Sequence, residues 1–208
     1  MAKDSPYQKY VWDFENRKMV GKFEEMYKAE DDHGFDSWYS SNLNHFPKQI
    51  HYTTLKRYNF SSILDFGCGK GAFTHILKKE NNYVLGLDIS ETAIKKARSY
   101  YGDHIDFDVI TDNNFEPIIK DRKFDLTIIL EVLSLIENWR NVIADISKFS
   151  NYIYIASFMP NNPIGFIKTK DSLVEEVNKY FKIEKKIILT ENNEDSIFIF
   201  AKNLNMEV

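Results

Sequence analysis

Three of the chain's eight glycines fall within five positions, at Gly67, Gly69 and Gly71. Glycine permits backbone conformations and close approaches that other residues cannot make, so this cluster marks a place that needs that freedom. The apolar run Ser61–Phe66 before it is typical of a buried strand, and Ala72–Lys79 after it has the apolar spacing of a helix. Open α/β sheets bind ligands at such strand-to-helix turns. The cluster therefore predicts an α/β fold with a ligand site at this turn, which we call the glycine turn (Gly67–Gly71).

The rest of the chain alternates between strand-like and helix-like segments. Strands are expected at Tyr83–Ile89, His104–Ile110, Phe124–Leu130 and Tyr152–Phe158, and helices at Glu91–Tyr101, Trp139–Phe149 and Asp171–Phe181. Ser90 is expected to cap the helix that follows it. This alternation predicts a mostly parallel sheet with helices on both faces. No helix fits between the final strand-like runs, Lys182–Thr190 and Ser196–Lys202, so they predict an antiparallel C-terminal hairpin.

The first 58 residues lack this alternation. We expect residues 1–58 to form a helical cap or lid over residues 59–208, which form the core of one structural domain. Within the cap, Asp31–Asp36 is interpreted as an exposed linker. Tyr27, Trp38 and Tyr39 would close an aromatic lid over a ligand, or alternatively pack only among the N-terminal helices.

Charge and cysteine content narrow the class of protein. Lysine and arginine total 27 against 31 aspartates and glutamates, and this net charge of −4 disfavours a broad nucleic-acid-binding face. The single cysteine excludes an internal disulfide framework and a cysteine-rich zinc cage. It indicates a reducing compartment, most simply the cytoplasm. No apolar run approaches the roughly 18 residues of a membrane span, and the amino terminus lacks the apolar core of a signal peptide.

Two cofactor classes compete for the glycine turn. Gly67, Gly69 and Ala72 satisfy the dinucleotide fingerprint, and Asp88 lies about 20 residues further on, where the ribose-binding acid is expected. Asp65, however, places a carboxylate at the start of the turn, where it would repel a pyrophosphate. S-adenosylmethionine carries an ammonium at its amino-acid end and no phosphate. The residues therefore favour S-adenosylmethionine over NAD.

Three segments resemble motifs of the class I S-adenosylmethionine-dependent methyltransferases. Ile63–Phe73 (ILDFGCGKGAF) resembles the first motif, Tyr83–Ser90 (YVLGLDIS) the second, and Phe124–Ile136 (FDLTIILEVLSLI) the fourth-strand motif. The last segment also resembles the nodulation-factor N-methyltransferase branch and its small-molecule relatives. The resemblance implies a Rossmann-like, seven-stranded sheet with an antiparallel last strand. The resemblance in sequence covers residues 60–158 well. The tail agrees with the family only in its expected topology, an antiparallel hairpin.

The resemblance also implies roles for particular residues. Asp65 and the glycine turn would surround the methionine and ribose portions, Asp88 would accept hydrogen bonds from the ribose hydroxyls, and Ile89 would pack on the adenine. The family has an acid after the third strand, near the adenine amino group. Thr111 and Asp112 are the nearest match here, and the register of the preceding strand is open by one residue. The complete set of expected cofactor-binding residues is Asp65, Gly67, Cys68, Gly69, Gly71, Asp88, Ile89, Thr111, Asp112 and Leu130, with Tyr27 from the cap. Cys68 is expected to be a small packing residue rather than a nucleophile.

Glu131 and His33 are the candidate catalytic residues. Glu131 follows the fourth strand and would bind or deprotonate an amine or hydroxyl nucleophile. Its structural alternative is to cap the helix that follows. His33 lies in the expected linker and would act as a base in a lid, with an ordinary exposed histidine as the alternative.

The expected function is transfer of a methyl group from S-adenosylmethionine to nitrogen or oxygen of a small molecule, such as an amino sugar or another metabolite. The transfer would be direct, so the protein mainly positions the nucleophile and excludes water. The alternatives are a non-catalytic cofactor-binding protein and a protein or RNA methyltransferase, and the acidic charge balance disfavours RNA. The residues leave the acceptor and the oligomeric state open.

Overall fold

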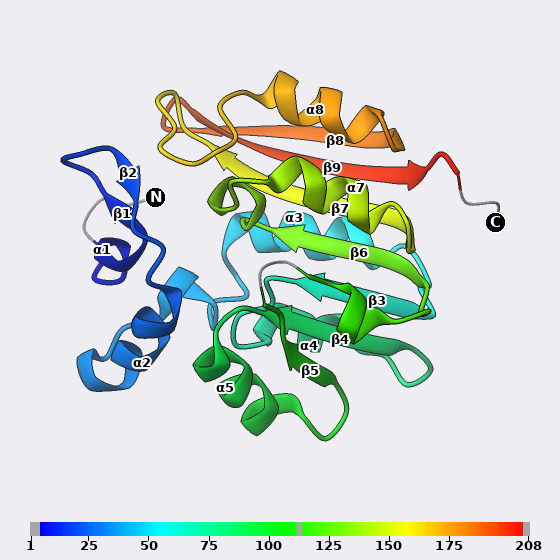
Figure 1. Cartoon of the computed structure of the whole chain (residues 1–208), viewed down its shortest axis with the longest axis horizontal. Helices are drawn as coiled ribbons and strands as arrows, with labels where there is room; N and C mark the ends of the chain where they lie inside the picture. The colour runs from blue at the N-terminus through cyan, green and yellow to red at the C-terminus, as the bar shows by residue number, and fades with distance from the viewer. Residues whose placement is uncertain (1–4, 112–113, 206–208) are drawn as a thin grey trace.

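The computed structural model describes residues 5–111 and 114–205. Its main sheet has seven strands (Figure 1). They are β3 (Ser62–Phe66), β4 (Tyr83–Asp88), β5 (Asp106–Val109), β6 (Phe124–Leu130), β7 (Ser150–Met159), β8 (Phe181–Glu191) and β9 (Glu194–Asn203). Their order across the sheet is β5-β4-β3-β6-β7-β9-β8. The first five strands in this order pair in parallel, whereas β9 runs antiparallel to both β7 and β8. The expected fold class is therefore confirmed.

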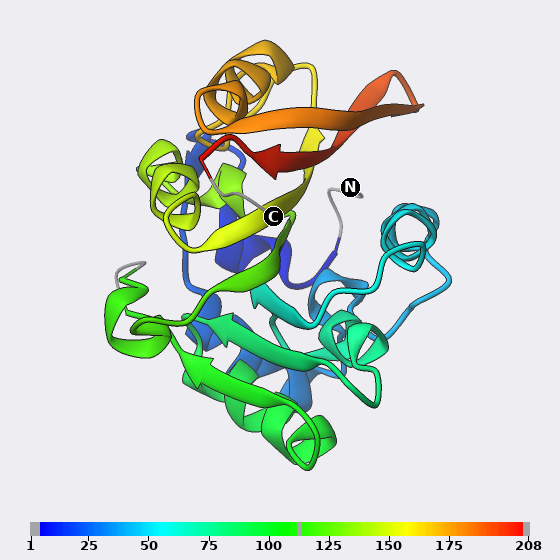
Figure 2. The ribbon, with the colours of Figure 1, turned by 90° about the vertical axis from the view of Figure 1, so that its right-hand side faces the viewer.

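Helices cover both faces of this sheet, as Figure 2 shows with the sheet seen from one end. One face packs against α3 (Phe46–Leu55), α4 (Ala72–Leu77) and α5 (Glu91–Tyr101), and the other against α6 (Glu116–Ile119), α7 (Trp139–Ile146) and α8 (Lys170–Asn178). Successive side chains of a strand point to opposite faces of the sheet. Ile63 accordingly packs on the face covered by α3 and α4, and Leu64 on the face covered by α6, α7 and α8.

Two local predictions agree closely with the structure. The helix α5 has the expected bounds, and the backbone N–H of Ala93 donates to the Ser90 hydroxyl at 3.1 Å, so Ser90 is its N-cap. The C-terminal hairpin turns more tightly than expected. Asn192 and Asn193 both have positive φ, 52° and 62°, which is the geometry of a two-residue hairpin turn. Asparagine tolerates this conformation, so both strands extend further than the sequence predicted.

The N-terminal segment contains elements that the sequence did not predict. Besides α1 (Gln8–Val11), α2 (Phe23–His33) and the short 3-10 helix η1 (Ser37–Tyr39), it has a two-stranded hairpin, β1 (Trp12–Asp13) and β2 (Lys18–Met19). The expected linker is partly wrong, because Asp31–His33 forms the last turn of α2. Gly34 ends that helix with a left-handed φ of 64°.

The segment lies at the edge of the sheet where the parallel strands end (Figure 1, blue). The carboxylate of Glu24 on α2 fixes it to the start of α5. It accepts hydrogen bonds from the hydroxyls of Ser90 and Thr92, both at 2.6 Å, and from the Thr92 N–H at 3.1 Å. Across residues 5–111 and 114–205, every helix is too short or too polar to span a bilayer.

Candidate functional site

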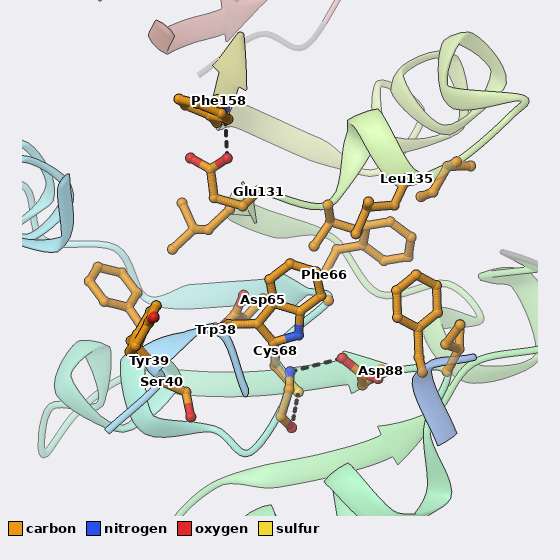
Figure 3. A pocket seen from close by; sticks show the side chains of 18 of the residues that line it. Trp38, Tyr39, Ser40, Asp65, Phe66, Cys68, Asp88, Glu131, Leu135 and Phe158 are labelled. Atoms are coloured by element: carbon orange, nitrogen blue, oxygen red, sulfur yellow. Dashed lines mark hydrogen bonds between the residues drawn. The ribbon is translucent and has the colours of Figure 1, made fainter. Parts of the chain in front are cut away.

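A cavity of about 1100 Å³ lies where the carboxyl ends of the parallel strands meet the N-terminal segment (Figure 3). Its walls come from distant parts of the chain: the N-terminal Tyr7, Met19, Phe23, Tyr27, Trp38 and Tyr39, the α3 residues Lys48 and His51, the glycine turn, the ends of β4, β6 and β7, and the β8–β9 turn. The carboxyl ends of parallel strands are where open α/β sheets bind ligands. Mostly apolar and aromatic walls with a few polar groups are typical of small-molecule sites.

The glycine turn needs glycine for close packing as well as for conformation. Gly67 and Gly69 have positive φ values of 81° and 54°. A Cβ atom at Gly67 would lie 2.2 Å from a methyl carbon of Val132, and one at Gly69 would lie 2.8 Å from the Tyr27 hydroxyl. Both glycines line the cavity. Their backbone is therefore exposed to a ligand at a place where a side chain has no room.

The Asp88 carboxylate holds this turn in place. One oxygen accepts a hydrogen bond from the backbone N–H of Gly69 at 2.9 Å (Figure 3). The other accepts one from the backbone N–H of Ser90, also at 2.9 Å. The side chain is nearly buried but reaches the cavity. Burial raises the pKa of Asp88, and the backbone N–H groups oppose that shift. Since each carboxylate oxygen can accept two hydrogen bonds, Asp88 can still accept from a ligand.

Asp65 is a buried carboxylate that lines the same cavity. It accepts a hydrogen bond from the Thr74 hydroxyl at 2.6 Å. Burial raises the pKa of Asp65 to about 7, and the charge of Asp88 adds to the shift. No lysine or arginine within the described residues forms an ion pair with it. A ligand cation beside Asp65 would therefore stabilise its ionised form.

Glu131 lies at the end of β6 with a left-handed φ of 62°. Its carboxylate crosses to β7 and accepts a hydrogen bond from the Phe158 N–H at 2.6 Å (Figure 3). Burial raises the pKa of Glu131 to about 7, although that hydrogen bond opposes the shift. The helix-capping alternative is wrong, because the following 3-10 helix η2 (Leu133–Leu135) has no side-chain cap. Glu131 instead bridges two strand ends and lines the cavity.

Tyr27, Trp38 and Tyr39 all line the cavity. They also pack within the N-terminal segment, where the rings of Tyr7 and Trp38 have centroids 5.3 Å apart. Trp38 and Tyr39 have positive φ values of 59° and 48°. Such a backbone is costly for large side chains, and its position here directs the two rings to the cavity wall. These residues therefore line the cavity and also pack within the N-terminal segment, and their closure over a ligand as a lid stays a prediction.

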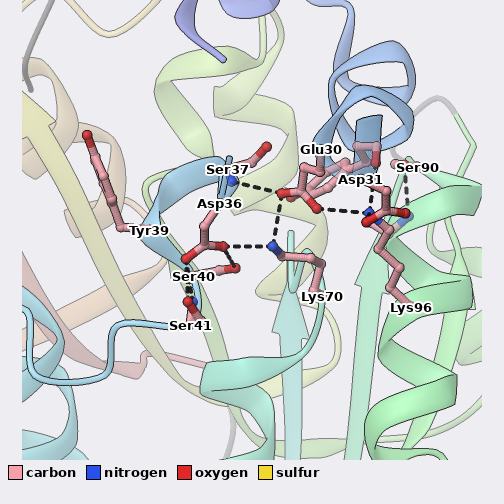
Figure 4. A network of polar contacts seen from close by, with 12 residues as sticks. Glu30, Asp31, Asp36, Ser37, Tyr39, Ser40, Ser41, Lys70, Ser90 and Lys96 are labelled. Carbon is pink, nitrogen blue, oxygen red and sulfur yellow. Dashed lines mark hydrogen bonds and ion pairs between the residues drawn. The ribbon is translucent and has the colours of Figure 1, made fainter. Parts of the chain in front are cut away.

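A buried ionic network joins the N-terminal segment to the glycine turn (Figure 4). Lys70, in the turn, donates to Glu30 at 2.9 Å and to Asp36 at 2.7 Å. Glu30 also accepts from Lys96 of α5, at 3.0 Å, and from the Ser37 N–H, at 2.8 Å. Burial tends to raise the pKa of Asp36, but Lys70 and nearby serine donors lower it to about 2. These ion pairs couple α2 and η1 to the turn.

The structure brings most of the predicted site residues together and leaves two outside. The predicted residues that line the cavity are Tyr27, Asp65, Gly67, Cys68, Gly69, Asp88, Ile89, Thr111, Leu130 and Glu131. Gly71 is not among the lining residues; a Cβ there would lie 2.8 Å from the Phe107 ring, so Gly71 serves packing at the start of α4. His33 is exposed at the end of α2 and does not line the cavity either. Asp112 lies outside the described residues.

Sequence reasoning missed one whole wall of the cavity. His45, Lys48 and His51 belong to α3 or precede it, and Phe158 and the β8–β9 turn complete this side. His51 is the most buried of these polar residues, with its Nδ1 atom 3.1 Å from the Tyr154 hydroxyl. Burial lowers the pKa of His51 to about 3. Nothing in the sequence distinguishes it from a histidine that only fills the core.

Comparison with known proteins finds that the core is similar to methyltransferases. Residues 64–150 match a family model described as a methyltransferase domain. The ubiquinone biosynthesis O-methyltransferase of Pasteurella multocida (strain Pm70) is 28% identical over 142 residues, which cover 62% of this chain and 58% of that protein. The matched part of the chain thus spans under two thirds of that relative.

Two solved structures share the fold over nearly their whole length. The N-methyltransferase NodS from Bradyrhizobium japonicum WM9, in complex with S-adenosyl-L-homocysteine, has a TM-score of 0.68 at 18% identity, over 86% of this chain and 98% of NodS. Magnesium protoporphyrin IX methyltransferase from Synechocystis PCC 6803, with bound S-adenosylmethionine, has a TM-score of 0.62 at 17% identity, over 86% of this chain and 95% of that one. The resemblance expected from the sequence is thereby confirmed: residues 64–150 are similar to a methyltransferase domain, and the chain has the Rossmann-like fold of solved methyltransferases that bind S-adenosylmethionine or S-adenosyl-L-homocysteine.

Proposed function

We propose that this protein transfers a methyl group from S-adenosylmethionine to a nitrogen or oxygen atom of a small molecule. The observation that carries the proposal is the buried carboxylate of Asp65 beside the glycine turn, which has no cationic partner among the described residues. A pyrophosphate would be repelled there, whereas an ammonium would be bound. The methyltransferase match over residues 64–150 and the cofactor-bound structural relatives support the same cofactor.

The lining residues fit the parts of this cofactor. Asp65 would bind the ammonium, and the backbone of the glycine turn would contact the methionine and ribose portions. Asp88 would accept hydrogen bonds from the ribose hydroxyls, and Ile89, with 49% of its surface exposed, would pack on the adenine. The bound cofactor supplies a methyl group on a positively charged sulfur atom, which is already a reactive electrophile.

The chain's own residues would position the acceptor and manage its proton. Glu131 uses one carboxylate oxygen to hold the Phe158 N–H, so its other oxygen can accept the proton of an amine or hydroxyl. A pKa near 7 suits a group that gains and loses protons at neutral pH. The aromatic residues of the N-terminal segment would exclude water from the cavity.

A small acceptor fits the size and cover of the cavity. Its volume of about 1100 Å³ is near the upper end of the range for small-molecule sites, so it can hold a cofactor with a modest second ligand. Met19 of β2 and the residues of η1 close it on the N-terminal side. This cover supports a metabolite rather than a protein or RNA as the acceptor.

Calorimetry tests the cofactor assignment directly. The protein should bind S-adenosylmethionine and S-adenosylhomocysteine, and should not bind NAD measurably. Because burial raises the pKa of Asp65 to about 7, part of this carboxyl is protonated at pH 7, and the ligand ammonium should displace that proton on binding. Titrations in two buffers of different ionisation enthalpy measure that release, and Asp65→Asn should abolish it. Binding of NAD without binding of S-adenosylmethionine or S-adenosylhomocysteine would overturn the proposal.

Hydrogen exchange tests the proposed lid. Tyr27 touches the glycine turn and Lys70 pairs with Glu30 and Asp36, so a ligand that orders the turn should also order the N-terminal segment. Adding S-adenosylhomocysteine should raise protection across residues 20–40 as well as at the turn.

The variant Lys70→Met is the control for this coupling, because it removes the charge but keeps a long side chain. It should retain protection at the turn and lose much of it across residues 20–40. A response confined to the turn and the Asp88 region in the wild-type protein would contradict the lid. The acceptor site would then have to be sought in the loop Met159–Lys170.

A further inference from the structure

The lining of the cavity carries many more carboxylates than cations. Its acidic residues, among those that the structure describes, are Asp65, Asp88, Glu91, Glu131, Glu137, Glu191 and Glu194. Lys48 is the one lysine in this described lining, which holds no arginine. Bound S-adenosylmethionine would bring one carboxylate against an ammonium and a sulfonium, so it would offset only part of this negative charge. The excess therefore bears on what else the cavity can bind.

The basic groups in the lining are already bonded or uncharged. Lys48 donates from its ammonium to the backbone carbonyl oxygens of Tyr39 and Ser40. Burial lowers the pKa of His51 to about 3. Burial and the charge of Lys48 also lower the pKa of His45, and Glu191 opposes that shift. At neutral pH both imidazoles are therefore largely uncharged, and they do not balance the carboxylates.

Three of the carboxylates lie on the side of the cavity toward β8 and β9, away from the glycine turn that follows β3. Glu131 follows β6 and bonds to the Phe158 N–H of β7. Glu191 and Glu194, which we call the rim pair, are paired directly across the turn between β8 and β9. Like charges directly opposite each other in a sheet repel, and none of the three carboxylates forms an ion pair within the described residues. A cation on the ligand would relieve this repulsion.

Three aromatic rings of the N-terminal segment supply an independent signal for a cation. Tyr7, Trp38 and Tyr39, which we call the aromatic corner, all line the cavity. The ring centroids of Tyr7 and Trp38 lie 5.3 Å apart with 51° between the ring planes, and those of Tyr7 and Tyr39 lie 6.0 Å apart with 79°. Rings inclined so steeply form a corner rather than a flat plate. The face of an aromatic ring attracts a cation, and several rings around one space are typical of sites for ammonium groups.

Polar contacts hold the aromatic corner in place. The Ser37 N–H donates to Glu30 at 2.8 Å, and Lys48 holds the carbonyl of Tyr39 and that of the next residue. Under these contacts Trp38 and Tyr39 keep their left-handed φ values. So costly a conformation persists only where the surroundings determine it. The rings are thus positioned before a ligand arrives, and binding there costs little ordering of side chains.

We infer that the methyl acceptor is a cationic amine, bound between the aromatic corner and the carboxylates of Glu131 and the rim pair. The inference rests on the proposed methyltransferase function and narrows the accepting atom from nitrogen or oxygen to nitrogen. A neutral acceptor would remove water from these carboxylates without compensating their charge, and an anionic acceptor would be repelled. The rim pair would draw the cation to the mouth of the cavity, and Glu131 would bind it at the reacting end.

The proton and electron balance of the transfer fits this arrangement. The ammonium first gives one proton to the carboxylate of Glu131, which frees the lone pair on nitrogen. That lone pair forms the bond to the methyl carbon while the carbon–sulfur bond breaks and leaves its electron pair on sulfur. The products are a methylated ammonium, S-adenosylhomocysteine and the protonated carboxyl of Glu131, which returns its proton to water. The product keeps the charge of the acceptor.

Benzylammonium and benzyl alcohol are the probes, because they share a ring and a size and differ in charge. Both are titrated by calorimetry into protein saturated with S-adenosylhomocysteine, so that the cofactor side of the cavity is filled. Benzylammonium should bind about tenfold to a hundredfold more tightly, as expected for a charge-assisted contact. Equal affinities, tighter binding of the alcohol or no binding of benzylammonium would each overturn the inference.

Neutralising the rim pair tests its part in binding. Glu191→Gln combined with Glu194→Gln should weaken benzylammonium binding about twofold to fivefold at low salt. The difference should shrink at high salt, which screens exposed charges. Glu175→Gln combined with Glu184→Gln is the matched control, because it removes the same charge at exposed positions outside the cavity lining. An equal loss in both double variants would mean that only the total charge matters, which contradicts the inference.

Substitutions of Trp38 test the aromatic corner. Trp38→Leu should weaken benzylammonium binding about threefold to tenfold, whereas Trp38→Phe keeps a ring and should retain most of the affinity. The affinity for S-adenosylhomocysteine reports whether the rest of the site is intact. If Trp38→Leu does not fold, Tyr39→Leu makes the same test at a side chain that is 46% exposed. Wild-type affinity for benzylammonium in the folded leucine variant would exclude the aromatic corner.

Methyl transfer decides the acceptor class without a chosen probe. A metabolite extract is passed over a cation exchanger at neutral pH, and both fractions are incubated with the protein and methyl-labelled S-adenosylmethionine. Label should be transferred to compounds in the retained fraction. Transfer only to compounds that flow through would overturn the amine and leave the proposed function standing. Failure of the protein to bind S-adenosylhomocysteine would instead overturn the proposed function itself.

Discussion

Replacing Asp88 with alanine should weaken the binding of S-adenosylhomocysteine about ten- to a hundredfold. The carboxylate would accept from the ribose hydroxyls, and a hydrogen bond to a charged group contributes about 1.5–3 kcal/mol. Asp88 also holds the N–H groups of Gly69 and Ser90 at 2.9 Å. The substitution therefore removes a ligand contact and loosens the turn that contacts the rest of the cofactor.

Calorimetry on matched variants measures this effect. Asp108→Ala is the control, because Asp108 lies in the neighbouring strand β5, its side chain is 53% exposed, and it does not line the cavity. It should bind like the wild type. Asp88→Asn keeps one accepting oxygen without the charge. Its affinity for S-adenosylhomocysteine should lie between those of Asp88→Ala and the wild type. Equal affinity of Asp88→Ala and wild type would defeat the assignment of Asp88 to the cofactor.

Glu131→Gln should slow methyl transfer about a hundredfold or more while leaving cofactor affinity unchanged. Glutamine keeps an oxygen that can accept from the Phe158 N–H, so the bridge between β6 and β7 survives. It cannot take a proton from the acceptor. The loss should therefore appear in the chemical step rather than in binding or folding.

Single-turnover rates measure that step once an acceptor has been found by screening metabolite extracts with a labelled methyl donor. Since burial raises the pKa of Glu131 to about 7, the ionised base is depleted below that pH, and the wild-type rate should rise as the pH passes through about 7. Glu131→Gln should lack this step. Glu137→Gln, at an exposed position on the cavity rim, is the control and should retain it. An unchanged rate in Glu131→Gln would mean that Glu131 only bridges the ends of β6 and β7.

The fold alone does not select the acceptor. The relatives described above include an O-methyltransferase, an N-methyltransferase and an enzyme named for magnesium protoporphyrin IX. Chemistry on a shared fold is decided by the site. Here the cavity lining outside the glycine turn and the strand ends includes residues of α3, the N-terminal segment and the β8–β9 turn. The acceptor experiments therefore concentrate on these elements.

The sequence determined the sheet and the side of the cavity formed by the glycine turn and Asp88, because both depend on local patterns. Apolar runs and helical spacing predicted β3 to β7 in order, and α5 has the expected bounds. Asp65, the glycine turn and Asp88 are close in sequence or end adjacent strands. The alternation of strands and helices is therefore enough to bring these residues together at one end of the sheet.

Only the tertiary structure decided what surrounds that core. The β1–β2 hairpin is too short to show a period, and the expected linker became a helix end because Gly34 caps α2. Glu131 bonds to Phe158, 27 residues away, and His51 to Tyr154, 103 residues away. Contacts between such distant residues depend on how the layers pack, which no local pattern records. The acceptor side of the cavity, built from these contacts, could therefore be found only in the folded chain.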